Sequence, residues 1–267
     1  MKRSVGKITF HLFGLLLITY FTLPMVVAVL MSFGPSRFLR LPTNKWTLKW
    51  YVEFFSTTKW MDGLWNSLIV SSLTIVFALI VGMATALAFT KYKYKWGAGL
   101  YTLSLTPVFT PAVIIAMSLL TVAYRTGMHG HYTIIAVAHS LWAFPLVIMV
   151  LKVSLDGLDK SLEEAARGMG ATPIQAFFTV TLPLIMPSVL VGALFAFIIS
   201  INEFIMALFL GTVDTETLPR IIYPVLRYRL TPLVAAASGV LMLLTVIVLL
   251  VAARLVNLGK LVQYQRS

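Results

Sequence analysis

Residues 161–183 read SLEEAARGMGATPIQAFFTVTLP, and they belong to a polar stretch, residues 155–183, that lies between long apolar runs. Ser161 and Glu164 have the spacing of a capping box, in which each side chain accepts the backbone amide of the other residue. This spacing predicts a short helix that starts at Ser161, and Gly170 is predicted to end it.

A second helix start follows directly. Thr172 suits the N-cap position, and Pro173 suits the first helical position, where no amide hydrogen is needed. Pro183 is predicted to end this second helix. The stretch therefore predicts two short helices joined by a glycine-containing turn, placed between two membrane-spanning segments.

The composition is that of an integral membrane protein. Of 267 residues, 59% are hydrophobic and 11% are charged, and the mean hydropathy is +0.92, which is outside the range of soluble globular domains. The absence of cysteine excludes disulfides, cysteine-ligated metals and thiol catalysis. The formal charge of +12 comes from small basic groups beside apolar runs, which indicates lipid headgroups as the partner and not nucleic acid.

Six apolar runs are long enough to cross about 30 Å of hydrocarbon as helices. The first run is too long for the core of a signal peptide, so we interpret it as an uncleaved span. Together the runs predict an all-helical, polytopic fold with six transmembrane helices and both termini on one side of the membrane. The runs lie at residues 10–31, 66–89, 100–123, 132–151, 184–210 and 233–256.

Basic residues give the orientation of these spans. Lysine and arginine recur in groups beside each predicted inner span end, whereas most of the remaining basic residues lie in the first loop. The positive-inside rule then places the N-terminal residues 1–9, the tail 257–267 and the polar stretch 155–183 in the cytoplasm. Residues 10–256 form the six-span domain between the two termini.

The first outer loop, residues 32–63, is rich in aromatic residues. Their spacing is compatible with a short amphipathic helix at the outer interface of the membrane. Two interpretations stay open: an aromatic anchor at the membrane surface, or a docking surface for an external partner. The aromatic residues are Trp46, Trp50, Tyr51, Phe54 and Phe55.

The polar stretch has the features of a docking element. Small residues on its first helix permit close approach of another backbone, and apolar residues on its second helix recur at i, i+3 and i+4. Without a partner, that apolar face would be exposed. The small residues are Ala165, Ala166 and Gly170, and the apolar ones are Ile174, Phe177 and Phe178.

With these residues the chain resembles the permease subunits of ATP-binding-cassette importers. That family carries Glu-Ala-Ala, three residues, Gly, nine residues, an aliphatic residue, any residue, Leu and Pro. This chain has Glu164-Ala165-Ala166, then Gly170, then Val180-Thr181-Leu182-Pro183 at the same spacing. The resemblance begins at about Asn66 and Ser67 and continues through Thr106, Pro107 and Pro111 to residues 234–238. Residues 207–232 are similar to the branch that includes spermidine/putrescine, opine and aminoalkylphosphonate importers.

The resemblance implies that the stretch is a pair of coupling helices that inserts into a cytoplasmic ATPase. ATP and magnesium would bind that ATPase, because this chain has no Gly-x-x-x-x-Gly-Lys-[Ser/Thr] stretch. The chain itself is expected to hold no cofactor and not to be an enzyme. The implied partners are a second permease subunit, two cytoplasmic ATPase subunits and an external solute-binding protein, assembled at a bacterial inner membrane. The implied docking residues are Glu164, Ala165, Ala166, Gly170, Ile174, Phe177, Leu182 and Pro183.

Asn202 and Glu203 lie inside the fifth predicted span. A carboxylate at mid-helix costs about 2.5 to 3.5 kcal/mol on insertion scales, so Glu203 is expected to face the bundle interior, a water-filled cavity or a basic partner. Two interpretations stay open: these residues line the substrate path, or Glu203 forms a structural pair with Arg220, Arg227 or Arg229. The similar branch commonly has an acidic pair here. With Asn202 in place of the first acid, we expect a small polar nitrogen-containing cargo, with a polyamine as the leading candidate.

Other features leave alternatives open. Pro107, Pro111 and Pro145 permit kinks in the third and fourth spans. His129 and His131 have no nearby carboxylates or cysteines and make a poor metal site. An ATP-independent secondary transporter or channel, with Glu203 as its ion or proton site, is the main rival. An intramembrane enzyme is disfavoured, because no convergent set of nucleophile, base and metal ligands is evident.

Overall fold

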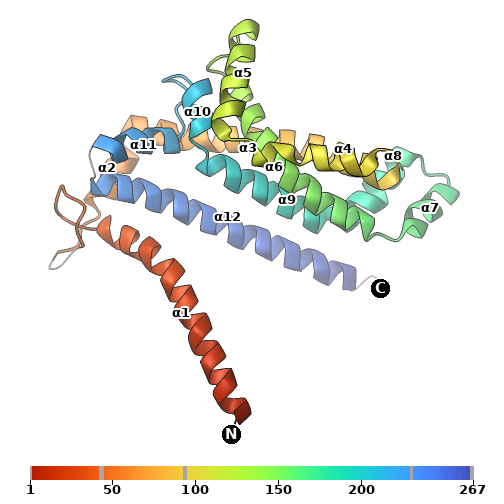
Figure 1. Cartoon of the computed structure of the whole chain (residues 1–267), viewed down its shortest axis with the longest axis horizontal. Coiled ribbons are helices and arrows are strands. Elements are labelled where there is room, and N and C mark those ends of the chain that lie inside the picture. Colours follow the sequence, from red (N-terminus) through yellow and green to blue (C-terminus); the bar gives the residue numbers. More distant parts are fainter. Residues whose placement is uncertain (1, 42–44, 93–94, 229–230, 265–267) are drawn as a thin grey trace. The chain divides into compact units, whose positions relative to one another are not determined.

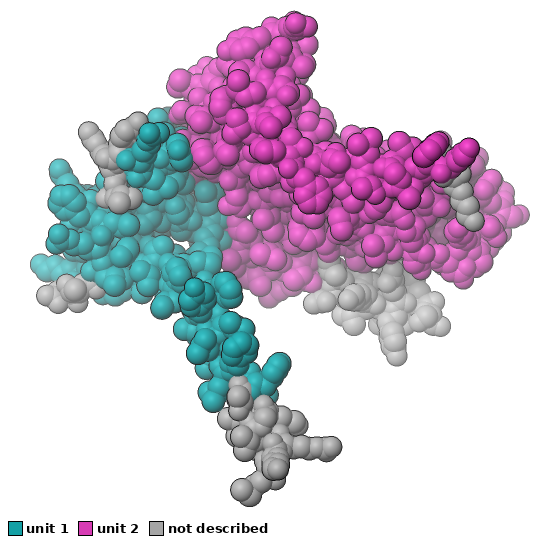
Figure 2. Space-filling model, in the orientation of Figure 1, with its two compact units in different colours: residues 1–61, 221–243 teal, residues 62–220, 244–267 magenta. Residues whose placement is uncertain are grey.

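A computed structural model describes residues 2–41, 45–92, 95–228 and 231–264. Every regular element in these ranges is helical (Figure 1), as the sequence predicts. The chain divides into two compact units, which Figure 2 colours separately. The first unit comprises residues 1–61 and 221–243, and the second comprises residues 62–220 and 244–267.

Five helical runs among the described residues are long and apolar enough to cross a membrane. They correspond to the first, second, fourth, fifth and sixth predicted spans, and α6 stays continuous through Pro145. They are α1 (Lys2–Met31), α3 (Thr58–Lys91), α6 (Tyr132–Asp156), the run Pro173–Asn202 that ends in α9 (Leu182–Asn202), and α12 (Pro232–Tyr264).

The third predicted span, residues 100–123, is not a single helix. It is divided into α4 (Gly97–Ser104), the 3₁₀ helix η1 (Thr106–Phe109) and α5 (Ala112–Thr126). Pro107 lacks an amide hydrogen, and Pro111 forces the preceding Thr110 into an extended conformation with φ −83° and ψ 127°. The two prolines therefore break the helix, where we expected kinks.

The fifth predicted span, residues 184–210, is also divided. α9 ends at Asn202, and α10 (Ile205–Leu210) follows after Glu203, whose backbone is extended at φ −79° and ψ 124°. The prediction of a continuous helix through Glu203 is therefore wrong. The carboxylate forms a local hydrogen bond to the following turn, and this competes with the continuous helical ladder.

Pro183 does not end the second short helix. The chain passes from α8 (Pro173–Ala176) through a π-helical turn, η2 (Phe177–Thr181), into α9. In the wider π turn the Leu182 amide donates to the Phe177 carbonyl. A proline ring would clash with the carbonyl four residues earlier in a regular α-helix, and the wide turn relieves that clash. The helix therefore continues through Pro183.

One part of the core of the second unit lies between α3, α6 and α9, and another part packs α5 and α10 against α3 and α6. α3 passes α6 so closely that a Cβ added at Gly82 would lie 2.7 Å from Val147 Cγ1, the kind of approach that small residues allow in membrane bundles. Ser200 Oγ joins the three helices through hydrogen bonds with Thr74 Oγ1 at 3.1 Å and His139 Nδ1 at 2.9 Å. His139 is therefore a buried packing residue.

The first unit contains the aromatic loop. A short helix, α2 (Lys49–Ser56), is present as predicted, with Trp50 and Phe54 buried. Trp50 Nε1 donates to the Gly34 carbonyl at 2.7 Å, and Tyr51 Oη shares a hydrogen bond with Ser32 Oγ at 2.8 Å. The placement of this helix at a membrane interface stays a prediction. Two further helices, α11 (Leu218–Tyr228) and α12, contain residues of both units.

Candidate functional site

The predicted pair of short helices is present as α7 (Lys160–Gly168) and α8 (Pro173–Ala176), and we call residues 160–178 the elbow. α7 begins at Asp159, whose Oδ1 accepts the Ser161 amide at 3.0 Å. The capping box predicted at Ser161 and Glu164 is therefore wrong. A carboxylate is a strong N-cap, and Asp159 starts the helix before Ser161 can.

Gly170 makes the turn between the two helices. It has φ +95°, which is the left-handed region. The Ala171 amide donates to the Ala166 carbonyl at 3.1 Å, and the Gly170 amide donates to the Arg167 carbonyl at 3.0 Å. These two bonds form a Schellman motif, which satisfies the last carbonyls of α7. The predicted role of Gly170 in the helix end is confirmed.

α8 starts as the sequence predicts, with Thr172 as N-cap and Pro173 in the first turn. The Gln175 amide donates to Thr172 Oγ1 at 3.3 Å, and the Thr172 amide donates to Gln175 Oε1 at 2.8 Å. This reciprocal pair is a capping box. We missed the role of Gln175, although its position three residues after Thr172 is the signal for it.

One ion pair fastens α7 to the end of α3. Lys91 Nζ lies 2.6 Å from Glu163 Oε1, and Thr181 Oγ1 donates to Glu163 Oε2 at 3.3 Å. The hydrogen bond from Lys91 holds the pKa of the Glu163 carboxyl below its usual value. The Glu-Ala-Ala motif pointed to the neighbouring Glu164, which is exposed. Glu163 was not predicted, because no local pattern marks a partner as distant in sequence as Lys91.

The elbow presents large apolar side chains to solvent. Met169 is 86% exposed, Ile174 is 71% exposed and Phe178 is 59% exposed, and we call these three residues the elbow face. Of the predicted docking residues, Ala166 is buried and Phe177 and Leu182 are half-buried. Ala166 therefore supports the elbow from inside. The exposed docking residues are Glu164, Ala165, Gly170, Ile174 and Pro183. Met169 lies outside the predicted set.

Asn202 and Glu203 lie in different surroundings. Asn202 is exposed, and its Nδ2 donates to the Ile198 carbonyl at 2.8 Å. Glu203 is 6% exposed, and its Oε1 accepts the Met206 amide at 3.0 Å. The two residues sit at the break between α9 and α10, which places a buried carboxylate beside an exposed amide.

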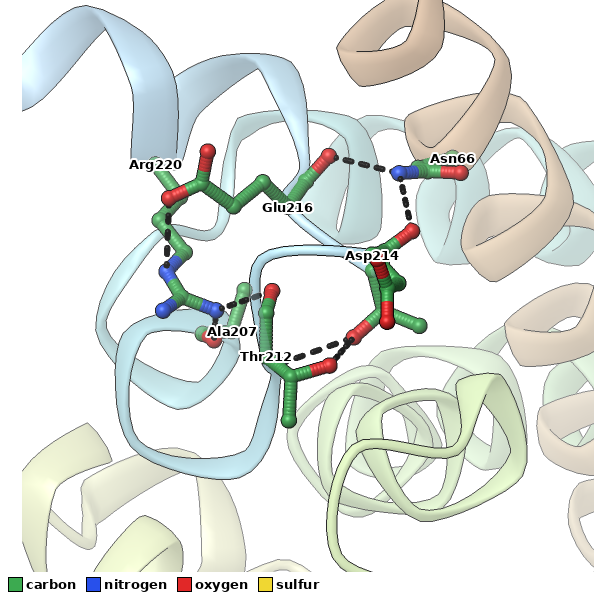
Figure 3. Close-up of polar contacts among 7 residues, drawn as sticks. Asn66, Ala207, Thr212, Asp214, Glu216 and Arg220 are labelled. Carbon is green, nitrogen blue, oxygen red and sulfur yellow. Dashed lines mark hydrogen bonds and ion pairs between the residues drawn. The ribbon is translucent and has the colours of Figure 1, made fainter.

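Arg220 was one candidate partner for Glu203, but it has other contacts. Its Nη1 donates to the Thr212 carbonyl at 3.0 Å and to the Ala207 carbonyl at 3.4 Å, and its Nε lies 3.7 Å from Glu216 Oε1 (Figure 3). A pair with Arg227 stays a prediction. Arg229, the third candidate, lies outside the described residues.

A polar clamp holds the loop that follows α10, residues 211–217. Asn66 Nδ2 donates to the backbone carbonyls of Asp214 at 3.1 Å and Glu216 at 2.9 Å (Figure 3). Tyr132 Oη donates to Asn66 Oδ1 at 2.8 Å. Three of the four hydrogen-bonding positions of the Asn66 side chain are therefore used. From the sequence, Asn66 marked only the start of the second predicted span and of the region that resembles the permease family. Its contacts with the loop were not predicted.

We define the polar clamp as Asn66, Ser67, Tyr132 and Arg220. Ser67 and the nearby Gly130 make further contacts in this region. Ser67 Oγ accepts the Leu218 amide at 2.8 Å. The Gly130 amide donates to the Leu210 carbonyl at 2.9 Å, and a Cβ at Gly130 would meet Thr212 Cγ2 at 2.6 Å. The loop is thus bonded to Asn66 of α3 and packs against the turn at Gly130, while Tyr132 at the start of α6 supports Asn66.

The described residues contain no group of three or more His, Cys, Asp or Glu side chains that could hold a metal ion. His129, one of the two histidines considered for such a site, instead stacks on Tyr124 with ring centroids 4.4 Å apart.

These features define a polytopic helical membrane protein with broken spans and an exposed two-helix elbow. Residues 78–258 match the family model described as "Binding-protein-dependent transport system inner membrane component", and the chain belongs to this family. It is therefore an inner-membrane permease component of an ATP-binding-cassette importer. This confirms the family resemblance and the localisation predicted from the sequence.

Two polyamine permeases of Escherichia coli (strain K12) are similar over most of the chain. The putrescine transport system permease protein PotI is 28% identical over 247 residues, which cover 90% of this chain and 86% of that protein. The spermidine/putrescine transport system permease protein PotC is 25% identical over 256 residues, which cover 96% of each chain.

Solved structures show the same fold. A bacterial ABC transporter involved in the import of the acidic polysaccharide alginate contains a chain that matches with a TM-score of 0.74 and 18% identity, over 96% of both chains. A chain of the MetNI methionine ABC transporter in an inward-facing conformation matches with a TM-score of 0.61 and 18% identity, over 74% of this chain.

Proposed function

We propose that this chain forms half of the translocation pathway of an ATP-driven solute importer and couples closure of an ATPase to alternating access. The elbow face is the observation that carries this proposal. Met169, Ile174 and Phe178 are exposed on a segment whose backbone is fixed by two helix caps and a Schellman turn. Large apolar side chains left exposed on a preorganised backbone are typical of a protein-docking site.

The elbow is joined directly to the membrane bundle. α8, η2 and α9 form one continuous helical run, Pro173–Asn202, so a force on α8 acts along α9 towards the break at Glu203. ATP binding would close the ATPase dimer, and the docked elbow would favour the membrane conformation that fits the closed dimer. The permease supplies no hydrolytic chemistry, and ATP and magnesium belong to the ATPase subunits.

The proposed assembly contains a second permease subunit, two cytoplasmic ATPase subunits and an external solute-binding protein. In the proposed orientation the elbow and both termini lie in the cytoplasm, and the polar clamp lies at the outer end. The family description supports a binding-protein-dependent system. The group of basic residues near the elbow, Lys91, Lys160 and Arg167, supports its cytoplasmic placement.

The proposed cargo is a small, polar, nitrogen-containing solute, with a polyamine as the leading candidate. The similarity to PotI and PotC along most of the chain supports this class. We place the break between α9 and α10, which begins at Glu203, beside the substrate path, with Asn202 as its exposed polar side chain, because a break in a membrane helix with polar side chains is tolerated where it lines a cavity.

Two substitutions on the elbow test the docking proposal: one reverses a charge and the other introduces a bulky side chain. Glu164→Arg and Gly170→Trp should abolish copurification of the ATPase subunits and leave membrane insertion intact. Asp214→Arg is the matched control, because Asp214 is exposed in the loop held by the polar clamp and only its backbone carbonyl contacts Asn66. Normal copurification of both elbow variants would contradict the proposal.

The energy source is tested separately. Uptake of radiolabelled putrescine into membrane vesicles should collapse when ATP is depleted and should survive dissipation of the proton gradient. The opposite pattern would favour a secondary transporter that uses Glu203 as its ion site.

A further inference from the structure

The break between α9 and α10 leaves backbone amides that need acceptors. The first amides of any helix have no partner within the helix, and in α10 the residues Met206 and Ala207 are fully buried. Inside a bundle without water, such an amide is costly unless a side chain accepts it. Glu203 Oε1 accepts the Met206 amide at 3.0 Å, while Glu203 itself is 6% exposed.

The other end of α10 is also fastened. The Leu210 carbonyl accepts the Gly130 amide at 2.9 Å, and the Ala207 carbonyl accepts a hydrogen bond from Arg220 Nη1 at 3.4 Å. Six residues are too few for a stable isolated helix. α10 therefore depends on these contacts, and Glu203 is the contact at its first turn.

Asn202 has the opposite character. It is exposed at the last turn of α9, and its Nδ2 donates a hydrogen bond to the Ile198 carbonyl. Its Oδ1 is an acceptor on the exposed side of the break. The C-terminal end of a helix carries partial negative charge, which favours a cation nearby.

We propose that Glu203 is a positioning residue that caps α10 and holds the break in place, and that the adjacent Asn202 meets the cationic cargo. This inference rests on the proposed function, because it assigns roles along the same substrate path. The two neighbouring polar residues thus have different roles. Glu203 is buried and supports α10, whereas Asn202 is exposed and contacts the cargo.

The experiment uses the complete importer, reconstituted in proteoliposomes with its binding protein, and radiolabelled putrescine as the probe. Glu203→Gln keeps an oxygen that accepts the Met206 amide and removes the charge, so uptake should stay within about twofold of the wild type with an unchanged KM. Glu203→Leu removes the cap and should lower uptake by at least about tenfold. Asn202→Leu should raise KM.

Hydrogen exchange of the α10 amides in the same assembled complex provides the second measurement. The Met206 amide should stay protected in the wild type, in Glu203→Gln and in Asn202→Leu, and should exchange at least about tenfold faster in Glu203→Leu. This measurement needs no transported cargo. A wild-type importer that does not take up putrescine would therefore defeat the cargo proposal, and the exchange rates would still decide the positioning role.

Three results would overturn the inference. Loss of uptake in Glu203→Gln with a protected Met206 amide would show that the charge itself meets cargo. An unchanged KM in Asn202→Leu would show that Asn202 does not meet the cargo. Unchanged protection in Glu203→Leu would show that Glu203 does not hold α10.

Discussion

The two ends of the α6–α9 pair are built in opposite ways. The elbow joins α6 to α9 at one end and exposes Met169, Ile174 and Phe178. At the other end the polar clamp uses Asn66 to bind two backbone carbonyls of a loop. Apolar side chains left exposed on a rigid segment indicate a missing protein partner. A polar network whose hydrogen bonds are made within the chain needs no partner to be stable.

The largest expected effect comes from placing charge on the elbow face. The double variant Ile174→Asp and Phe178→Asp would bury two carboxylates in the proposed interface, where an unpaired charge is strongly unfavourable. Copurification of the ATPase should fall to background. Because both positions are exposed, the melting temperature of the isolated permease should change little.

Val213→Asp is the control for this variant, because Val213 is 80% exposed in the loop at the clamp end. It should leave copurification unchanged. An equal loss of ATPase copurification in the double variant and in Val213→Asp would mean that the elbow and the clamp end do not differ in docking.

Disrupting the polar clamp should affect the stability of the permease. Asn66→Leu removes the donors for the Asp214 and Glu216 carbonyls and the acceptor for Tyr132 Oη. The three hydrogen bonds are part-buried, and each contributes about 0.5 to 1.5 kcal/mol net, so we expect a loss of about 2 kcal/mol or more in the free energy of unfolding. Denaturant unfolding in detergent measures it, with the exposed Asn202→Leu as the matched control. Equal stability of Asn66→Leu and the wild type would mean that the clamp does not support the frame.

The glycine turn of the elbow gives a smaller effect. A Cβ at Gly170 would meet nothing within 4 Å, but its φ of +95° is unfavourable for alanine, so Gly170→Ala should destabilise the turn by about 1 kcal/mol. Gly168→Ala lies in the helix, also without steric contact, and should stabilise α7 slightly. Hydrogen exchange across residues 160–176 distinguishes the two, and equal rates would contradict the left-handed turn.

The smallest effect concerns pH. The hydrogen bond from Lys91 lowers the pKa of the Glu163 carboxyl, so this pair stabilises α7 above the unfolded pKa of about 4.3, and the contribution disappears as pH falls through the lower folded value. Lys91 is 38% exposed, so the contribution is about 0.2 to 1 kcal/mol. Corrected for the intrinsic pH dependence of amide exchange, the protection of α7 should fall between pH 6 and pH 3 more in the wild type than in Glu163→Gln. Identical pH profiles would show that the pair is not formed.

Local signals in the sequence predicted the local parts of the fold. Thr172 and Pro173 start α8, and Gly170 turns the chain, because each acts on its own backbone and its nearest neighbours. The predictions were wrong where two local signals compete. Asp159 starts α7 ahead of Ser161, and the π turn before Pro183 lets the helix continue.

Long-range contacts could not be predicted from the sequence. The hydrogen bonds of Asn66 join residues 148 and 150 positions apart, and no periodic pattern marks such partners. The difference between Asn202 and Glu203 also depends on tertiary packing, which buries Glu203 and leaves Asn202 exposed. The sequence placed both residues correctly in the fifth apolar run and could not separate their roles.

Site-directed crosslinking can show whether the ATPase docks on the elbow. The chain has no cysteine of its own, so a single introduced cysteine can be labelled. Ile174→Cys and Val213→Cys would each carry a photoactivatable maleimide in the assembled importer. The probe at position 174 should crosslink to the ATPase subunit, and the probe at position 213 should not. Crosslinking to the ATPase from position 213, with none from position 174, would show that the elbow is not the docking site.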